Sequence, residues 1–264
     1  SKIHSERVIS IIYRRLISII PSKDLVVLTS TENSDDELVA LCQEYDFNVF
    51  RGSLSSVSKR FVEFTDKEAC DYVIRINGDN LFTDLSLLDK MLELCRTNCF
   101  DFISNVKDRT FPIGMSIECI RSSFLKNTKQ FFIGENNEHV TKWIYSDTSI
   151  NSYFIKSNLE FKDASIALDN PEDVVLLEKL YAYEKYLGKY ITTKDVFNFL
   201  ERTTTWRRPN DEPTLIAEIG GNHEGDLNRA KALLNLAIDS GVDVVKFQVY
   251  TGDTLVNSAL SPGR

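Results

Sequence analysis

The 264-residue sequence lacks several features that would place it in a special class of protein. It has no run of about 18 apolar residues, so no transmembrane helix is expected. Its five cysteines are odd in number and none forms a C-x-x-C pair, which favours free thiols in a reducing compartment and predicts a cytoplasmic protein. Neither G-x-G-x-x-G nor G-x-x-x-x-G-K-[ST] occurs, so no glycine-rich motif for cradling phosphate is present.

An excess of positive charge is also missing. Lys and Arg number 31 against 39 Asp and Glu, which gives a formal net charge of −8. Nucleic acids and anionic membrane surfaces both attract basic patches, so we expect neither as a partner. Hydrophobic residues make up 42% of the chain, which is typical of a globular protein with one large domain or two smaller ones.

Short β-like runs alternate with helical patterns through the first 200 residues. Strands alternating with helices predict βαβ units, and therefore an α/β fold with a mostly parallel, Rossmann-like sheet and helices on both faces. Residues 105–168 are less regular, and we expect antiparallel hairpins there. The predicted strands are Leu25–Ser30, Asn48–Phe50, Tyr72–Ile76 and Phe100–Ser104, and the clearest helices are Ser5–Ile20, Val57–Thr65, Leu85–Arg96, Pro171–Leu187 and Lys194–Glu201.

Residues 202–213 (RTTTWRRPNDEP) change the character of the chain, because they are polar and contain two prolines. They predict a linker between a first domain, 1–201, and a second, 214–264. The second domain begins with one βαβ pattern, namely strand Thr214–Ile219, helix Leu227–Asp239 and strand Asp243–Tyr250. One such unit cannot bury its own faces, so we expect a larger sheet or barrel around it, or association of the chain with copies of itself.

Two aspartates are candidates for binding a metal ion. Asp79 follows a predicted strand and a glycine, at the edge where open α/β sheets bind ligands. Asp169 ends an apolar run just before a predicted helix. Two carboxylates at strand ends can hold Mg²⁺, which binds phosphate oxygens in turn. The alternative is that both residues form turns or helix caps and have no further role.

A series of short motifs over roughly residues 5–190 resembles the cytidylyltransferases of acidic sugars. The similarity is to the spore-coat-polysaccharide type and to relatives that activate sialic acid. The motifs follow the order of that family, and they are Val27–Thr31, Ser34–Asp36, Arg51–Ser53 with Val57, Arg60 and Phe61, Arg75–Asp79, Gly114–Glu118, Glu138–Thr141 and Asp169–Asp173.

The resemblance implies a nucleotide-diphospho-sugar-transferase-like sheet, with CTP and an acidic sugar as substrates. It implies that Asp79 and Asp169 hold Mg²⁺ as cofactor. It places Arg51, Gly52, Ser53, Arg75 and Gly78 near the nucleotide or sugar. For Arg51 the alternative is a surface ion pair, and for Glu138 and His139 it is a helix cap and a packed histidine.

One departure from that family concerns its opening strand and its basic, glycine-containing loop, which binds the triphosphate. This sequence has neither. Without the loop the triphosphate lacks backbone N–H donors and compensating positive charge. We therefore expect the chain alone to transfer nucleotidyl groups poorly or not at all.

Alternation along the strands of the second domain places polar residues together. Lys246 and Gln248 share one face of their strand, and Glu218 lies on the matching face of its own strand. The stretches Ile216–Asp226 and Asp243–Gln248 resemble the start of sialic acid synthases, and so imply the first βαβ unit of a TIM barrel. Those enzymes condense phosphoenolpyruvate with an N-acylated amino sugar.

This second resemblance implies that Lys246 contacts phosphoenolpyruvate and that Glu218 and Gln248 line the sugar site as catalytic residues. The alternative is an ion pair between Glu218 and Lys246 with a structural role alone. The metal-binding histidines of that family lie further along the barrel and are absent from this sequence. We therefore do not expect the second domain to be catalytic as it stands.

Together the two resemblances predict a fragment of a bifunctional enzyme that makes and activates a nonulosonic, sialic-acid-like sugar. One alternative is a GT-A-type glycosyltransferase, which would bind a UDP-sugar rather than CTP. Another is a remnant or binding module without catalytic activity.

Overall fold

The computed structural model describes residues 2–128, 140–161, 164–204 and 215–248. It divides into two compact units, Ser1–Phe199 and Leu200–Arg264. The linker predicted at 202–213 overlaps the end of helix α7 (Thr193–Thr204), and its residues 205–213 lie outside the described residues.

The first unit begins with a small hairpin that the sequence did not predict. Strands β1 (Lys2–Ile3) and β2 (Glu6–Arg7) pair in antiparallel orientation through a turn in which His4 and Ser5 have positive φ angles. Helix α1 (Val8–Leu16) therefore starts three residues later than expected. The helix predicted at Ser5–Ile20 is too long at both ends.

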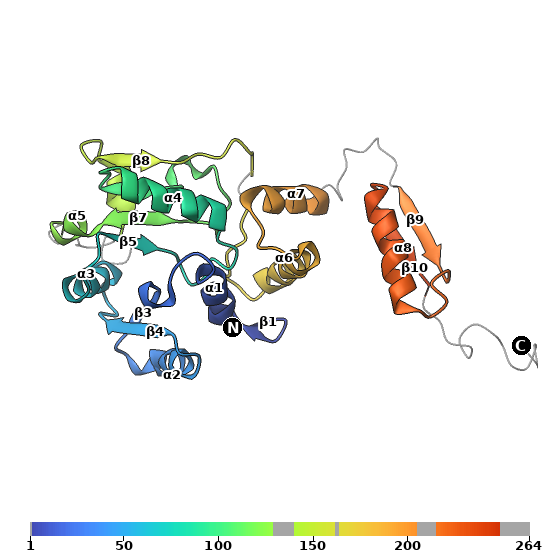
Figure 1. Cartoon of the computed structure of the whole chain (residues 1–264), viewed down its shortest axis with the longest axis horizontal. Helices are drawn as coiled ribbons and strands as arrows, with labels where there is room; N and C mark the ends of the chain where they lie inside the picture. The colour runs from blue at the N-terminus through green and yellow to red at the C-terminus, as the bar shows by residue number, and fades with distance from the viewer. Residues whose placement is uncertain (1, 129–139, 162–163, 205–214, 249–264) are drawn as a thin grey trace, which may run out of the picture. The chain divides into compact units, whose positions relative to one another are not determined.

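A parallel pair of strands follows α1. Strands β3 (Val26–Ser30) and β4 (Asn48–Gly52) pair in parallel, with α2 (Asp36–Glu44) between them in the sequence. This pair is separate from the larger sheet of the unit (Figure 1). A further crossover helix, α3 (Val57–Lys67), leads from β4 towards that sheet.

The larger sheet has four strands in the order β5-β7-β6-β8 and is mixed rather than mostly parallel. Strand β7 is antiparallel to both neighbours, whereas β6 and β8 are parallel. The segment between β6 and β7 contains only the 3₁₀ turn Lys107–Arg109 and no crossover helix, so β7 returns antiparallel. The strands are β5 (Tyr72–Arg75), β6 (Phe102–Ser104), β7 (Glu118–Arg121) and β8 (Ser152–Phe154).

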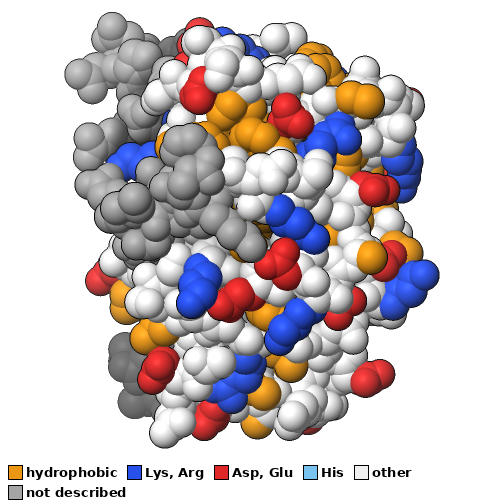
Figure 2. All heavy atoms as spheres, turned by 90° about the vertical axis from the view of Figure 1, so that its left-hand side faces the viewer, with side chains coloured by type: hydrophobic (Ala, Val, Ile, Leu, Met, Phe, Trp, Pro, Cys, Tyr) orange, Lys and Arg blue, Asp and Glu red, His pale blue; other side chains and the backbone are white. Residues whose placement is uncertain are grey.

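Four more helices complete the described part of the first unit. They are α4 (Leu85–Thr97), α5 (Ser122–Lys126), α6 (Asp173–Leu187) and α7, with short 3₁₀ turns at Ser22–Asp24, Asn33–Asp35 and Lys142–Ser146. Of these helices, α5 contacts β7 of the sheet and α6 contacts β1. One core cluster consists of Val62, Phe102, Ile120, Leu125, Val140 and Ile144. On the face in Figure 2, Lys and Arg side chains are interspersed with Asp and Glu, without a large patch of either sign.

Buried polar contacts connect helices that are distant in sequence. Asp84 caps α4 by accepting hydrogen bonds from the N–H groups of Ser86 and Leu87, at 2.9 and 3.2 Å. Its other oxygen accepts from the backbone N–H and hydroxyl of Thr193 at the start of α7, at 2.6 and 2.7 Å. The fully buried Arg15 of α1 forms an ion pair with Glu184 of α6.

The second unit is a βαβ arrangement in the described residues. Strands β9 (Ile216–Gly220) and β10 (Val244–Phe247) pair in parallel, and α8 (Leu227–Asp239) connects them. The Asp226 side chain caps α8. Whether the unit begins a TIM barrel stays a prediction. No helix among the described residues is long and apolar enough to cross a membrane.

Candidate active site

Asp79 lies in the turn that follows β5, as its sequence position predicted. The N–H of Asn80 donates to Asn77 O at 3.1 Å, and the Asn80 side chain donates to Ser116 O at 2.9 Å, so the turn is held against the next segment. The Oδ1 atom of Asp79 is buried and has no hydrogen-bond partner among the described residues. Burial raises the pKa of Asp79, the charge of Asp169 raises it further, and Arg75 opposes both.

Asp169 is brought close to Asp79 by a pairing of two loops. Ile166 N–H donates to Ile113 O at 2.8 Å, and Leu168 N–H donates to Asp79 O at 3.3 Å. Asp169 does not cap α6. Instead, the side chain of Asp173 accepts from the backbone N–H groups of Asp169 and Asn170, at 2.9 and 2.7 Å. The Asp169 carboxylate thus does not serve as a helix cap, and it lies close enough to Asp79 for its charge to raise the pKa of Asp79.

The two carboxylates fit a Mg²⁺ site in which most ligands come from substrate and water. The described residues contain no cluster of three or more His, Cys, Asp or Glu side chains able to hold a metal. Mg²⁺ is commonly bound by one or two carboxylates together with phosphate oxygens and water, so two are sufficient. A buried, unpartnered carboxylate oxygen is costly unless a ligand satisfies it.

A hollow of about 470 Å³ opens beside Asp79 in the first unit. It includes residues that the sequence did not single out, notably Arg7 and Glu37, which lie 3.7 Å apart. Arg7 precedes α1 and Glu37 lies in the first turn of α2, and neither position carries a motif that would have identified it. The lining consists of Arg7, Val8, Ile9, Ser34, Glu37, Leu38, Leu41, Gly78, Asp79 and Leu168.

Arg75 is the last residue of β5, and Gly78 lies in the turn that follows. Gly78 faces open space, since a Cβ added there would meet no atom within 4 Å. Arg75 Nη1 donates to Glu118 Oε2 of β7 at 2.5 Å. Glu118 is nearly fully buried, and its other oxygen accepts from Thr141 and Tyr145. Burial and the neighbouring Glu118 charge raise the pKa of Tyr145.

Arg51, Gly52 and Ser53 are not among the residues that line this hollow. Arg51 donates from Nε to Ser30 O at 2.8 Å and from Nη2 to Glu32 O at 2.9 Å, and it pairs with Asp36 at 2.7 Å. These bonds tie the end of β3 to the start of α2. Gly52 packs against Arg60, where a Cβ would lie 2.9 Å from its side chain. Ser53 Oγ accepts from the Ser56 N–H at 3.2 Å, before α3.

In the second unit, Glu218 and Lys246 are cross-strand neighbours, as their alternation predicted. Lys246 Nζ lies 2.7 Å from Glu218 Oε2, and both side chains are about half exposed. A Cβ at Gly220 would lie 3.6 Å from Glu218 Oε1 and 3.7 Å from Gln248 Oε1, so these two side chains flank the same glycine. The three predicted residues of this unit are therefore neighbours.

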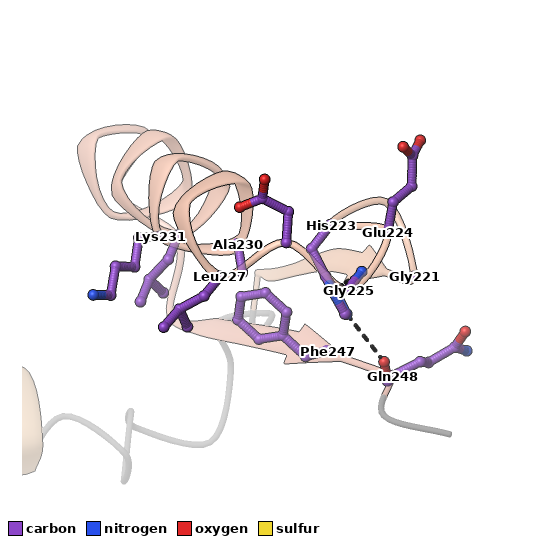
Figure 3. Close-up of a pocket in the computed structure, with 11 residues that line it drawn as sticks. Gly221, His223, Glu224, Gly225, Leu227, Ala230, Lys231, Phe247 and Gln248 are labelled. Carbon is purple, nitrogen blue, oxygen red and sulfur yellow. Dashed lines mark hydrogen bonds between the residues drawn. The ribbon is translucent and has the colours of Figure 1, made fainter. Parts of the chain in front are cut away.

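A second hollow, of about 650 Å³, lies between α8 and β10 (Figure 3). Apolar side chains including Leu227, Ala230 and Phe247 line it. His223 accepts from the Gly225 N–H through Nδ1 at 3.1 Å, and its Nε2 lies 3.3 Å from Gln248 O, so it serves to fix the first loop. This hollow is larger than the one beside Asp79, but both of its carboxylates are engaged within the unit, Asp226 as the cap of α8 and Glu224 in an ion pair with Arg229, and we assign no chemistry to it.

Comparisons with known proteins concern both units. A family model described as cytidylyltransferase matches residues 1–189. The spore coat polysaccharide biosynthesis protein SpsF of Bacillus subtilis is 30% identical over 165 residues, which is 60% of this chain and 67% of that protein. The N,N'-diacetyllegionaminic acid synthase of Legionella pneumophila is 54% identical over 46 residues, 17% of this chain and only 13% of that synthase.

A solved cytidylyltransferase structure from Leptospira borgpetersenii superposes with a TM-score of 0.70 at 22% identity, covering 80% of this chain and 90% of that one. This likeness shows an α/β nucleotidyltransferase-like fold. The family match covers most of the chain, including both aspartates and the hollow beside them. The chain therefore belongs to the cytidylyltransferase family.

Proposed function

We propose that the first unit transfers CMP from CTP to an acidic sugar destined for a surface polysaccharide. Membership of the cytidylyltransferase family supports the reaction class, and the similarity to a spore coat polysaccharide protein supports the kind of sugar. In this reaction the anomeric hydroxyl oxygen attacks the α-phosphorus of CTP. A new O–P bond forms, the bond from the α-phosphorus to the oxygen bridging to the β-phosphate breaks, pyrophosphate leaves, and the hydroxyl proton is released to solvent.

The buried, unpartnered Oδ1 of Asp79 carries this proposal. Asp79 and Asp169 would hold Mg²⁺ together, and the ion when bound would neutralise charge on the phosphates. The exposed Gly78 leaves room for a ligand to approach the backbone next to Asp79. The hollow between α1, α2 and Asp79 would receive part of the nucleotide or sugar.

The second unit supports a second step in the proposal, the condensation of phosphoenolpyruvate with an N-acylated amino sugar. The supporting observations are the 54% identity to a legionaminic acid synthase and the pairing of Lys246 with Glu218. We infer that these residues and Gln248 belong to the strand-end site of a sialic acid synthase-like barrel, within a bifunctional enzyme of nonulosonic acid biosynthesis.

Isothermal titration calorimetry of the full chain tests the first activity. With Mg²⁺ present we expect CTP to bind in preference to UTP and UDP-sugars, and Asp79→Asn to weaken CTP binding by more than about tenfold. Asp89→Asn, which removes an exposed carboxylate from α4, is the matched control and should bind like wild type.

The other outcomes discriminate between the alternatives. Binding of a UDP-sugar in place of CTP would support a glycosyltransferase of the GT-A type. Absence of any Mg²⁺-dependent nucleotide binding would support a non-catalytic module. Pyrophosphate release from CTP and an acidic sugar, measured with Mg²⁺ present, tests the transfer step itself, and its absence despite CTP binding would contradict the proposed reaction.

A further inference from the structure

We propose that Arg75 binds an oxyanion of the substrate and that Glu118 is the positioning residue that orients it. This inference rests on the proposed function, since the oxyanion belongs either to the sugar carboxylate or to the phosphates of CTP. It is carried by a comparison between two arginines at opposite ends of one strand pair. In the β5/β7 register, Arg75 faces Glu118 and Arg121 faces Tyr72.

Arg121 makes more contacts with the protein than Arg75 does, from two of its three nitrogens and from the face of its guanidinium. Its Nη2 donates to Tyr72 OH at 2.6 Å, and its Nε donates to Phe100 O at 3.2 Å and lies 3.4 Å from Asp101 Oδ1. Its guanidinium also stacks 4.9 Å above the Tyr72 ring. These contacts are what a structural arginine at a sheet edge makes.

Arg75 differs, although its side chain is similarly exposed, at 21% against 26% for Arg121. Within the described part of the chain its one hydrogen bond joins Nη1 to Glu118. A guanidinium carries five N–H donors in a planar fork, so most of the N–H groups of Arg75 donate to no described residue. None of its nitrogens is among the buried, unpartnered atoms of the described residues, so these donors reach solvent.

Glu118 is held more firmly than an ion pair requires. Its Oε1 accepts from Thr141 Oγ1 at 2.6 Å and from Tyr145 OH at 2.5 Å, while Oε2 accepts from Arg75. The Tyr145 oxygen lies 2.7 Å from Ser104 Oγ, which extends the network to β6. A carboxylate fixed from three sides holds one edge of the guanidinium in a single orientation.

Stability alone does not account for this network. Burying a carboxylate costs free energy, and an apolar pair of similar size is often as stable as a buried ion pair. A fixed guanidinium edge, in contrast, suits bidentate recognition of a carboxylate or phosphate. Arg75 is the last residue of β5 and Asp79 lies in the turn that follows, so an oxyanion at the free edge of Arg75 would lie near the proposed Mg²⁺ site, although Arg75 itself does not line the hollow beside Asp79.

The test compares charged and neutral probes by calorimetry with Mg²⁺ present. The pairs are CTP with cytidine, and N-acetylneuraminate with its methyl ester. For Arg75→Lys, which keeps the charge but loses the fork, we expect about tenfold weaker binding of one charged probe and unchanged binding of its neutral partner. Arg121→Lys is the matched control and should bind both members of each pair like wild type.

Two further variants address folding and positioning. The double variant Arg75→Gln/Glu118→Gln leaves no buried charge unpaired, and it should lose at least as much affinity for the charged probe. Glu118→Asp keeps the net charge but shortens the side chain, so it should displace Arg75 and weaken the same probe by about tenfold or less. A purely structural Glu118 would affect charged and neutral probes alike.

The outcomes separate this inference from the proposed function. If wild type binds CTP and the Arg75 variants bind every charged probe equally well, the inference is wrong and the function stands. An equal loss in Arg121→Lys also overturns it. If wild type binds neither CTP nor N-acetylneuraminate, both fail. A loss for N-acetylneuraminate identifies the sugar carboxylate as the oxyanion, and a loss for CTP identifies a phosphate.

Discussion

Asp35 shows how a single carboxylate fixes the loop after β3. Its Oδ2 atom accepts from the hydroxyl of Thr29 at 2.6 Å and from the backbone N–H of Ser30 at 2.8 Å. These hydrogen bonds, chiefly that of Thr29, lower the pKa of Asp35 from 3.8 to about 2. The ionised carboxylate is therefore part of the folded state, next to the residues of α2 that line the hollow beside Asp79.

The depressed pKa gives a prediction for stability against pH. Asp35 should contribute stability that is fully present above pH 3.8 and is lost as the pH falls through about 2. The difference in unfolding free energy between wild type and Asp35→Asn should therefore shrink between these values. Urea denaturation over this pH range measures it, with Asp89→Asn as the control for loss of one exposed carboxylate. A difference that does not vary with pH would contradict the prediction.

Single residues also show what the sequence could and could not predict. The positions of Asp79 and Asp169 at strand and loop ends were readable, because an apolar run that stops at a carboxylate is a local pattern. For Arg51 the alternative of a surface ion pair agrees with its contact to Asp36, but its hydrogen bonds to two backbone carbonyls were not predicted. Two nitrogens of Arg51 donate hydrogen bonds to the carbonyls of Ser30 and Glu32, and these contacts form only when β3 and β4 pair.

Gly114 determines how two loops approach each other at the site. Its φ angle is +95°, and an added Cβ would lie 2.5 Å from Ala167 N and from Ile166 C. Both the backbone conformation and the close approach require glycine. Through this loop pairing the Leu168 N–H donates a hydrogen bond to the carbonyl of Asp79, which brings Asp169 close to Asp79.

Gly114→Ala should therefore destabilise the first unit by about 2–5 kcal/mol, from backbone strain together with overpacking. Gly188→Ala is a matched control, since Gly188 also has a positive φ but a Cβ there would meet no neighbour within 4 Å. We expect about 1–2 kcal/mol for the control. Urea denaturation gives both values, and equal losses would show that the close approach is unimportant.

The secondary structure was predictable wherever the pattern was local. Helix α8 was placed correctly, and the β3, β4 and β5 strands within two residues, because helical spacing and apolar runs specify them. The antiparallel strand β7 lies within residues 105–168, where antiparallel hairpins were expected, but its bounds and its pairing with β5 were not predicted, because strand partners are set by contacts distant in sequence. The β1–β2 hairpin was also missed, because its turn uses His4 and Ser5 rather than glycine.

The second unit exposes more apolar surface than a small βαβ arrangement can bury by itself. Leu227 and Leu236 of α8 are 67% and 63% exposed, and Leu215 and Ile216 beside β9 are 58% and 53% exposed. Among the described residues, β9 and β10 pair only with each other. Unpaired strand edges and exposed leucines both favour contact with another chain.

For the whole molecule we therefore expect concentration-dependent association. Sedimentation velocity of the full chain should show oligomers whose fraction rises with protein concentration, because burying leucine side chains between copies is favourable. Leu227→Gln/Leu236→Gln should shift the distribution towards monomer. Leu54→Gln, which replaces a leucine of the first unit that is 57% exposed, should leave it unchanged. A wild-type chain that stays monomeric at all concentrations would show that these leucines do not mediate contact between copies.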